Sequence, residues 1–391
     1  MVDVACGDQH SIVRTALGDV YAFGRNQNGQ LGLGGDQDVM QPRQVVALKG
    51  IKVTGVACGA EHSVACSEAG EVYAWGWGRY GNLGNGTRED AATPSRCIGL
   101  EGVKVTKGRG AGSPLPACDA IQLVHMTGGP ASAVACGWRH SIAVSEEGRL
   151  FTWGWSKYGQ LGHCDFGDRT EAAEVEAFRG RPVRSAAGGW RHTLAITEDG
   201  TLWSWGWNRY GQLGRETGSG PVEAGGESCS AAPAAVEGLA GKNVDLMACG
   251  WKHSVAVCRD GDVYTWGRGV NGQLGHGDSS DLTRPRQGAR GNAVVAARAA
   301  TTPPPPVLCR RLDALCRSKV SLEALRAALP TGDGGAAGRS DRFGVVPDQA
   351  PAPATLAHSI DHGLPEAAEV SRASAEGAAA PLCPHGCPPR S

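Results

Sequence analysis

The sequence predicts an all-β protein, a β-propeller built from repeated blades, on three observations. One template recurs five times, its copies follow one another at intervals of about fifty residues, and the chain holds 59 glycines without a collagen period. Glycine at that level indicates many tight turns and therefore many short strands. Because a unit of this size made of short strands cannot bury its own faces, radial stacking of the units is expected.

Each copy of the template contains two segments. The first segments are VACGDQHSIV from Val4, VACGAEHSVA from Val56, VACGWRHSIA from Val134, AAGGWRHTLA from Ala186 and MACGWKHSVA from Met247. The second segments, each after a polar turn, are YAFGRNQNGQLG, YAWGWGRYGNLG, FTWGWSKYGQLG, WSWGWNRYGQLG and YTWGRGVNGQLG. In the third copy we expect strands over 140–145 and 149–155, joined by a turn over 146–148.

The spacing of the repeated histidines locates the insertions. His10, His62, His140, His192 and His253 are separated by 52, 78, 52 and 61 residues. The two longer intervals coincide with Gly- and Ala-rich runs over 107–132 and 215–232, which we expect to be surface loops between repeats. The predicted domains are a propeller over 1–290 and a low-complexity, disordered tail over 291–391.

Charge and cysteine usage restrict the function classes. The chain carries 38 basic and 39 acidic side chains, so no global field favours nucleic acid or a membrane surface. Cys6, Cys58, Cys136 and Cys249 occupy one repeated strand position, where a buried thiol acts as a small apolar residue. Because no signal peptide or membrane-spanning run is recognised, we expect a soluble, reducing, intracellular setting.

The two residues that precede the histidine in each copy are the main candidates for a functional site. They are Asp8-Gln9, Ala60-Glu61, Trp138-Arg139, Trp190-Arg191 and Trp251-Lys252. Since equivalent positions in successive blades lie at similar radius and height, we expect three indoles and three cations side by side at one axial face. Acidic residues stand at the same level in the first two copies, so this face is self-complementary under a two-fold axis. Further cations at one repeated place are Arg79, Lys157 and Arg209, of which we expect Arg79 and Lys157 to belong to the dimer interface.

Packing is the alternative explanation for repeated aromatic residues. We expect it for Trp75, Trp77, Trp153, Trp155, Trp205, Trp207 and Trp266. It fits the indoles at 138, 190 and 251 less well, because packing alone does not require a cation beside each ring. Such cation–π contacts contribute roughly 0.5–2 kcal/mol each.

The His-Ser/Thr strand followed by Trp-Gly and Gly-Gln-Leu-Gly resembles the regulator-of-chromosome-condensation repeat, a family of seven-bladed propellers. Five repeats are recognisable here. Relative to the family pattern, we expect about two N-terminal repeats to be absent, which leaves blade faces and strand edges open.

Within that superfamily, Gly-Trp-Arg-His-Ser/Thr in successive blades resembles the plant and green-algal UV-B photoreceptors of the UV-resistance-locus type. The resemblance implies that Trp138, Trp190 and Trp251 are the chromophore, with no bound cofactor and with Trp190 and Trp251 most important. It also implies that light splits a dark homodimer into active monomers. The interface residues that it implies are Arg139, Arg191 and Lys252 against the indoles, and Arg25 with Glu61 as a further intersubunit pair.

This chain departs from that family pattern. Lys252 stands where the family has arginine, and an ammonium cannot stack or chelate a carboxylate as a guanidinium does. The acidic partners of Arg191 and Lys252 are expected in the absent repeats.

The tail contains two recognisable segments. Leucines at helical spacing predict an amphipathic helix over 308–329, and a Val-Pro motif occupies 343–348. The photoreceptor resemblance implies that Val346, Pro347 and Asp348 bind the WD40 domain of a ubiquitin ligase. It further implies WD40 proteins that regulate redimerisation, and residence in cytoplasm and nucleus.

No catalytic set stands out, so we do not expect an enzyme. The five histidines are explained by a hydrogen bond inside each blade, and Cys383, His385 and Cys387 are a weak signal for a metal. The main alternative is a guanine-nucleotide exchange factor or chromatin-associated propeller, which predicts a basic arm and a β-wedge. A generic scaffold of the ubiquitin pathway is a third, and leaves the Val-Pro motif unexplained.

Overall fold

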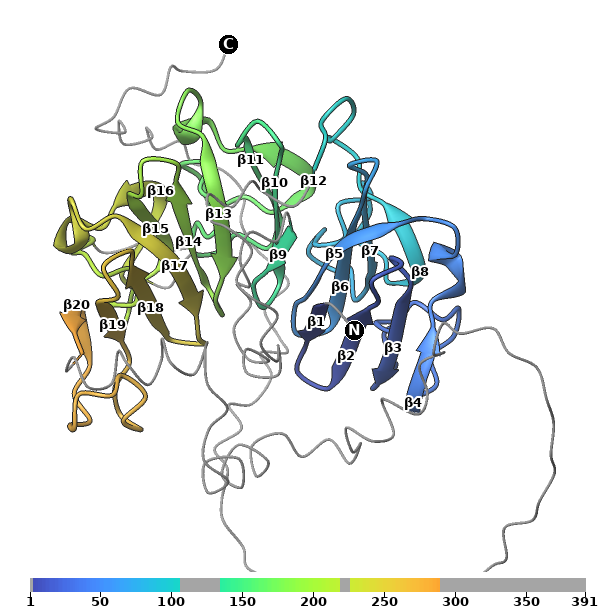
Figure 1. Cartoon of the computed structure of the whole chain (residues 1–391), viewed down its shortest axis with the longest axis horizontal. Coiled ribbons are helices and arrows are strands. Elements are labelled where there is room, and N and C mark those ends of the chain that lie inside the picture. Colours follow the sequence, from blue (N-terminus) through green and yellow to red (C-terminus); the bar gives the residue numbers. More distant parts are fainter. Residues whose placement is uncertain (1–2, 106–133, 219–225, 289–391) are drawn as a thin grey trace, which may run out of the picture. The chain divides into compact units, whose positions relative to one another are not determined.

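The computed structural model describes residues 3–105, 134–218 and 226–288, and it confirms the predicted all-β fold. These residues form five four-stranded antiparallel sheets, one for each repeat, with the strands of every sheet in chain order (Figure 1). All the strands belong to one compact unit, Met1–Leu329. The sheets are called blades 1 to 5 below.

The strands of the five blades have the following bounds. Blade 1 is β1 (Asp3–Cys6), β2 (His10–Arg14), β3 (Val20–Gly24) and β4 (Val39–Gln44). Blade 2 is β5 (Val53–Cys58), β6 (His62–Ser67), β7 (Val72–Gly76) and β8 (Ala91–Arg96). Blade 3 is β9 (Val134–Cys136), β10 (His140–Val144), β11 (Leu150–Gly154) and β12 (Arg169–Glu174). Blade 4 is β13 (Val183–Gly188), β14 (His192–Thr197), β15 (Leu202–Trp207) and β16 (Cys229–Ala235). Blade 5 is β17 (Val244–Cys249), β18 (His253–Cys258), β19 (Val263–Gly267) and β20 (Leu282–Gln287).

The hairpin of blade 3 shows how the repeat folds locally. The strands predicted over 140–145 and 149–155 agree within one residue at each end with β10 and β11. Gly148 stands in the turn between them at a φ of 81°, a conformation that glycine adopts without steric strain. Every residue of both strands is buried, because neighbouring blades cover both faces of the hairpin.

The repeated histidines join adjacent blades, so the expected hydrogen bond inside each blade is wrong. His140 Nε2 lies 3.0 Å from the hydroxyl of Thr193 in blade 4, and that hydroxyl donates to the carbonyl of Gln160 in blade 3. Since a hydroxyl has one proton, the imidazole N–H is the donor to Thr193. Sequence patterns within one repeat cannot reveal which blade supplies the partner. The other three such contacts are His10–Ser63, His62–Ser141 and His192–Ser254.

At each of these junctions, a tryptophan of the later blade also packs against the earlier blade. In blade 5, Trp266 donates its indole N–H to the carbonyl of Gln212 in blade 4, at 2.8 Å. A Cβ added to Gly214 would lie 2.9 Å from that indole nitrogen, so only glycine lets the ring approach so closely. At the equivalent Gly275 of blade 5, nothing lies within 4 Å of the Cβ position. Among the described residues, no tryptophan packs against Gly275, so this face of blade 5 is not covered by a further blade.

The second predicted insertion is shorter than its composition suggested. Residues 229–232 belong to β16, where small residues pair with β15. Arg215, at the start of the predicted insertion, is anchored by hydrogen bonds to the hydroxyl and the carbonyl of Ser204. Composition therefore extended the predicted end of this loop into β16, and the loop lies inside blade 4, between β15 and β16, rather than between repeats as expected. The first insertion and the tail, including 308–329 and the weak metal signal of Cys383, His385 and Cys387, lie outside the described residues.

Candidate functional site

The residues that precede the histidines lie in the turn between the first and second strands of each blade. In blade 3 this turn holds Trp138 and Arg139, between β9 and β10. The loop after the third strand, which carries Trp155 and Tyr158, leaves the sheet at the same edge. Antiparallel pairing requires this, because strands one and three run in the same direction and end on the same side. Each blade therefore presents two loops to one face.

Backbone hydrogen bonds between successive turns set the level of these side chains. The amide of Asp8 donates to Ala60, the amide of Ala60 to Trp138, and the amide of Trp138 to Gly189, each at 3.1 Å. This chain of bonds links four blades. The side chains that follow are thereby brought to corresponding positions along one face.

The three predicted indoles are in ring contact. The ring centroids of Trp138 and Trp190 lie 5.6 Å apart at an interplanar angle of 68°. Those of Trp190 and Trp251 lie 6.0 Å apart and are nearly parallel, at 21°. Trp190 is thus the central ring, and Trp251 is 62% exposed at the end of the row. Edge-to-face and stacked pairs at these distances are favourable.

The predicted cations lie over these rings. The guanidinium carbon of Arg139 lies 3.8 Å from the centroid of Trp138, and that of Arg191 lies 3.9 Å from Trp190. Lys252 differs from both, because its Nζ lies 4.7 Å from the ring of Trp190 in the preceding blade. Trp190 therefore lies close to two cations. Desolvation lowers the pKa of Arg139, yet arginine stays protonated in proteins.

A second row of aromatic residues, assigned above to packing alone, also belongs to this site. Trp155 and Trp207 lie 5.9 and 5.3 Å from Trp138 and Trp190, respectively. The tyrosines Tyr80, Tyr158 and Tyr210 alternate with these indoles in one cluster. Sequence reasoning missed the tyrosines, although the motif Trp-x-Arg/Lys-Tyr-Gly occurs only in copies two to four and was a usable signal.

The tyrosine hydroxyls orient the guanidinium groups. Arg191 donates to the hydroxyl of Tyr158 at 2.6 Å, and its guanidinium also lies within 5.4 Å of the rings of Trp155 and Trp207. Arg139 donates to the hydroxyl of Tyr80 at 3.4 Å. We call this surface the aromatic face. Its indoles are Trp138, Trp155, Trp190, Trp207 and Trp251, its tyrosines are Tyr80, Tyr158 and Tyr210, and its cations are Arg139, Arg191 and Lys252.

The acidic residues lie at the blade 1 and blade 2 side of this face. Arg25 Nη1 lies 3.6 Å from Glu61 Oε1 within this one chain, whereas the resemblance implied an intersubunit pair. Asp8 accepts a hydrogen bond from the Trp138 side chain. Desolvation, together with the carboxylate of Glu61, raises the pKa of Asp8 against the opposing charge of Arg139.

The outer cations are less closely tied to the rings. Arg79 is exposed and Lys157 is half-buried. Arg209 pairs with Glu227 at 2.8 Å, and the same carboxylate accepts the indole N–H of Trp207. The structure therefore brings Arg209 to the aromatic cluster through an acidic residue that the sequence analysis did not single out.

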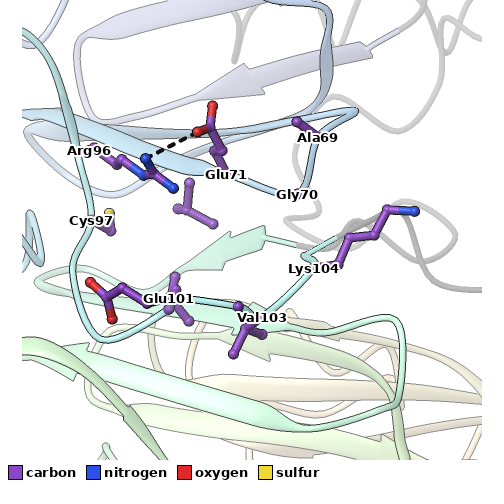
Figure 2. Close-up of a pocket in the computed structure, with 11 residues that line it drawn as sticks. Ala69, Gly70, Glu71, Arg96, Cys97, Glu101, Val103 and Lys104 are labelled. Carbon is purple, nitrogen blue, oxygen red and sulfur yellow. Dashed lines mark ion pairs between the residues drawn. The ribbon is translucent and has the colours of Figure 1, made fainter.

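A pocket outside the aromatic face lies along the end of blade 2. It is lined by residues 69–72, by Arg96 at the end of β8 and by residues from the 97–104 segment, and the ion pair between Glu71 and Arg96, at 3.2 Å, lies on one side of it (Figure 2). None of its lining residues belongs to the aromatic face. No histidine is among its lining residues. Its one cysteine, Cys97, is buried, and burial raises the pKa of its thiol, so the lining offers no activated nucleophile.

In the described part of the chain, no group of three or more metal-ligating side chains comes together. Among the helices described, none has the length and apolar character needed to cross a membrane. Burial raises the pKa of the thiols of Cys58, Cys136 and Cys249, which suits packing better than reactivity. Val346, Pro347 and Asp348 lie outside the described residues.

Comparison with known proteins gives one family and several relatives. The Regulator of chromosome condensation (RCC1) repeat matches residues 18–66, 69–113, 147–196, 199–257 and 260–300. A second description of the same repeat matches residues 1–30, 53–82, 131–160, 183–212 and 244–273, which overlap the first set.

Among curated proteins, the chain is 44% identical over 283 residues to the Ultraviolet-B receptor UVR8 of Arabidopsis thaliana, covering 72% of this chain and 56% of that protein. It is 36% identical over 301 residues to the E3 ubiquitin-protein ligase HERC2 of Homo sapiens, covering 75% of this chain and 6% of that protein. Among solved structures, human WBSCR16 aligns with a TM-score of 0.57 and 28% identity, covering 73% of this chain and 66% of that one. The chain thus spans just over half of the first relative and a small part of the second.

Proposed function

Since the chain belongs to the regulator of chromosome condensation repeat family, we propose that it is a UV-B photoreceptor of that family whose chromophore is its own tryptophan cluster. One observation carries the proposal. Trp138, Trp190 and Trp251 are in ring contact at one face, and each ring of the first two lies under a guanidinium. The similarity to an ultraviolet-B receptor supports the same assignment.

The proposed mechanism couples light absorption to charge. Indole absorbs in the UV-B range, and contact between the rings lets the excitation be shared within the row. The cations over the rings are held by cation–π contacts and by hydrogen bonds to tyrosine hydroxyls. Excitation changes the charge distribution of the ring beneath Arg191 and so weakens the contacts that orient this cation. A surface that binds through the cation then loses its partner.

The proposed partner in the dark is a second copy of the chain. The face carries acidic groups on the side of blades 1 and 2 and cations on the side of blades 3 to 5, which suits two-fold association. The monomer released by light would then bind a WD40-domain ubiquitin ligase through Val346, Pro347 and Asp348, in cytoplasm and nucleus. No cofactor and no enzymatic step is part of this proposal.

Size-exclusion chromatography with light scattering tests the proposal on the full chain. Kept in the dark, the chain should elute as a dimer, and narrow-band UV-B should convert it to a monomer. Trp190→Phe should remain dimeric after illumination. Trp203→Phe is the matched control, because Trp203 packs on Phe178 and makes no ring contact with the row, and it should respond normally. An elution volume that light leaves unchanged would contradict the proposal.

An exchange factor or chromatin-associated propeller remains the alternative. It does not require an indole row lined with cations, and no described observation favours it over the photoreceptor. Binding of a small GTPase or of nucleosomes, with no response to illumination, would support it instead.

A further inference from the structure

Lys252 is the one residue of the aromatic face that differs in kind from its counterparts. Blades 3 and 4 place arginine after the tryptophan, and blade 5 places lysine. In the described part of the chain, Lys252 is the one lysine within cation–π distance of a tryptophan, since the only other lysine there with a cation–π contact, Lys242, contacts Tyr264. The ring that it reaches is Trp190, the central ring of the row.

We propose that Lys252 acts as a proton donor to photoexcited Trp190 and thereby quenches the chromophore. The ammonium nitrogen lies 4.7 Å from the centroid of this ring and is half-buried, which keeps it at the ring while limiting competing water. Photoexcited indole carbons are more basic than those of the ground state, and nearby ammonium groups protonate them. Arg191, which also lies close to the ring, cannot serve, because a guanidinium does not release its proton at ordinary pH.

The step is balanced within the two side chains. An N–H bond of the ammonium breaks as a C–H bond forms on the excited ring, leaving a neutral amine and a protonated indole. Decay to the ground state makes that carbon a strong acid, and the proton returns to the amine. No oxidant, reductant or further reactant takes part, and both side chains are restored.

The charges around Lys252 favour release of its proton. Arg268, Arg191 and Arg209 all face it, and Tyr210 lies 5.4 Å away as the other ring near its ammonium. Desolvation and these three arginines lower the pKa of Lys252 from its ordinary value. Glu227 neutralises part of this charge through its pair with Arg209.

The inference deepens the proposed function and rests on it for its consequence, since quenching limits how much absorbed light can act at the interface. Its test is photophysical and needs no dimer. Time-resolved tryptophan fluorescence of the full chain is recorded at neutral pH in H₂O and D₂O, because a proton-transfer step slows in D₂O whereas electron transfer to arginine does not depend on the proton. The native chain should show a short-lived component that lengthens in D₂O.

Two variants decide the assignment. Lys252→Arg should keep the positive charge but lose the solvent isotope effect, and it should emit more strongly than the native chain. Trp190→Phe should lose the isotope effect together with the short-lived component. Lys242→Arg is the matched control, because the ring that Lys242 contacts belongs to Tyr264 and not to a tryptophan, and it should behave as native.

An isotope effect of equal size on the short-lived component in the native chain and in Lys252→Arg would overturn the inference, as would a short-lived, isotope-sensitive component that persists in Trp190→Phe. The proposed function is tested separately, by the elution volume before and after illumination. If light fails to change the elution volume while the isotope effect depends on Lys252, the photoreceptor proposal fails and the quenching stands. If light splits the dimer but the isotope effect is absent, the reverse holds.

Discussion

The indole of Trp266 in blade 5 lies 2.9 Å from the position that a Cβ of Gly214 in blade 4 would occupy. The same relationship joins Gly32 to Trp75, Gly84 to Trp153 and Gly162 to Trp205. At each junction between the described blades, the indole thus fits only because the facing residue is glycine and has no Cβ. Among residues 3–105, 134–218 and 226–288, none lies within 4 Å of the Cβ position of Gly275, so this glycine is an internal reference for the other four.

Gly214→Ala should therefore be much more destabilising than Gly275→Ala. Both glycines have φ near +70°, so an alanine at either position is strained by about 1–2 kcal/mol. Only at position 214 does the methyl group also overlap an indole, which adds roughly 1–3 kcal/mol. Urea unfolding followed by circular dichroism measures both variants. Equal losses in the free energy of unfolding would show that the junction does not depend on this contact.

Acid should destabilise the fold through the histidines that join the blades. Burial lowers the pKa of His62, His140 and His192 to about 3 and that of His10 to about 4. Between the ordinary value of 6.5 and these values, the unfolded chain takes up protons that the folded chain refuses. Stability is thus complete above pH 6.5 and falls with pH below it, by up to about 1.4 kcal/mol per unit for each histidine.

Unfolding midpoints measured in urea from pH 8 to pH 4 check this slope. His140→Gln keeps a side-chain N–H for Thr193 but cannot take up the proton. It should be less stable than the native chain at pH 8 and should lose less stability between pH 6 and pH 4. A slope unchanged by this variant would assign the acid sensitivity to other groups.

Arg184 should matter far more than other paired arginines. Its side chain is 8% exposed, and it joins blade 4 to blade 5 through the carboxylate of Asp245 and the carbonyls of Val244 and Asp245. Arg184→Ala removes this donor from the carbonyl of the buried Val244 and breaks the pair with the more exposed Asp245, and we expect a loss of about 1–3 kcal/mol. Arg179→Ala is the control, because its pair with Glu176 is exposed and contributes less than about 1 kcal/mol. Thermal unfolding of both variants separates the two cases.

The indole row should produce an exciton signal in the near-UV circular dichroism spectrum. Ring centroids 5.6 and 6.0 Å apart couple the transitions of Trp138, Trp190 and Trp251. Trp190→Phe removes the central ring and should weaken the signal strongly, because only the contact between Trp138 and Trp155 then couples indoles at this end of the row. Trp203→Phe removes an indole whose nearest recorded ring partner is Phe178, and should leave the signal in place. If both variants retain the signal equally, the row is not coupled in solution.

Local pattern in the sequence sufficed for the blades and for the expectation that the indoles of Trp138, Trp190 and Trp251 lie side by side. Alternation within each copy determines its hairpins, and recurrence of the copies determines that their faces must pack on one another, so the strands of blade 3 were predicted within one residue. The level of the Trp-Arg pairs followed from the same recurrence, because equivalent residues of stacked units lie at equivalent positions.

Only the tertiary structure decided which blade supplies each partner. His140 bonds to Thr193 of the next blade, and Lys252 lies over Trp190 of the preceding one. A repeat contains the same residue types in every copy, so the sequence pattern is identical whether a side chain finds its partner within its own blade or across a junction. Twist and spacing between the sheets make that choice, and these arise only when the blades are packed together.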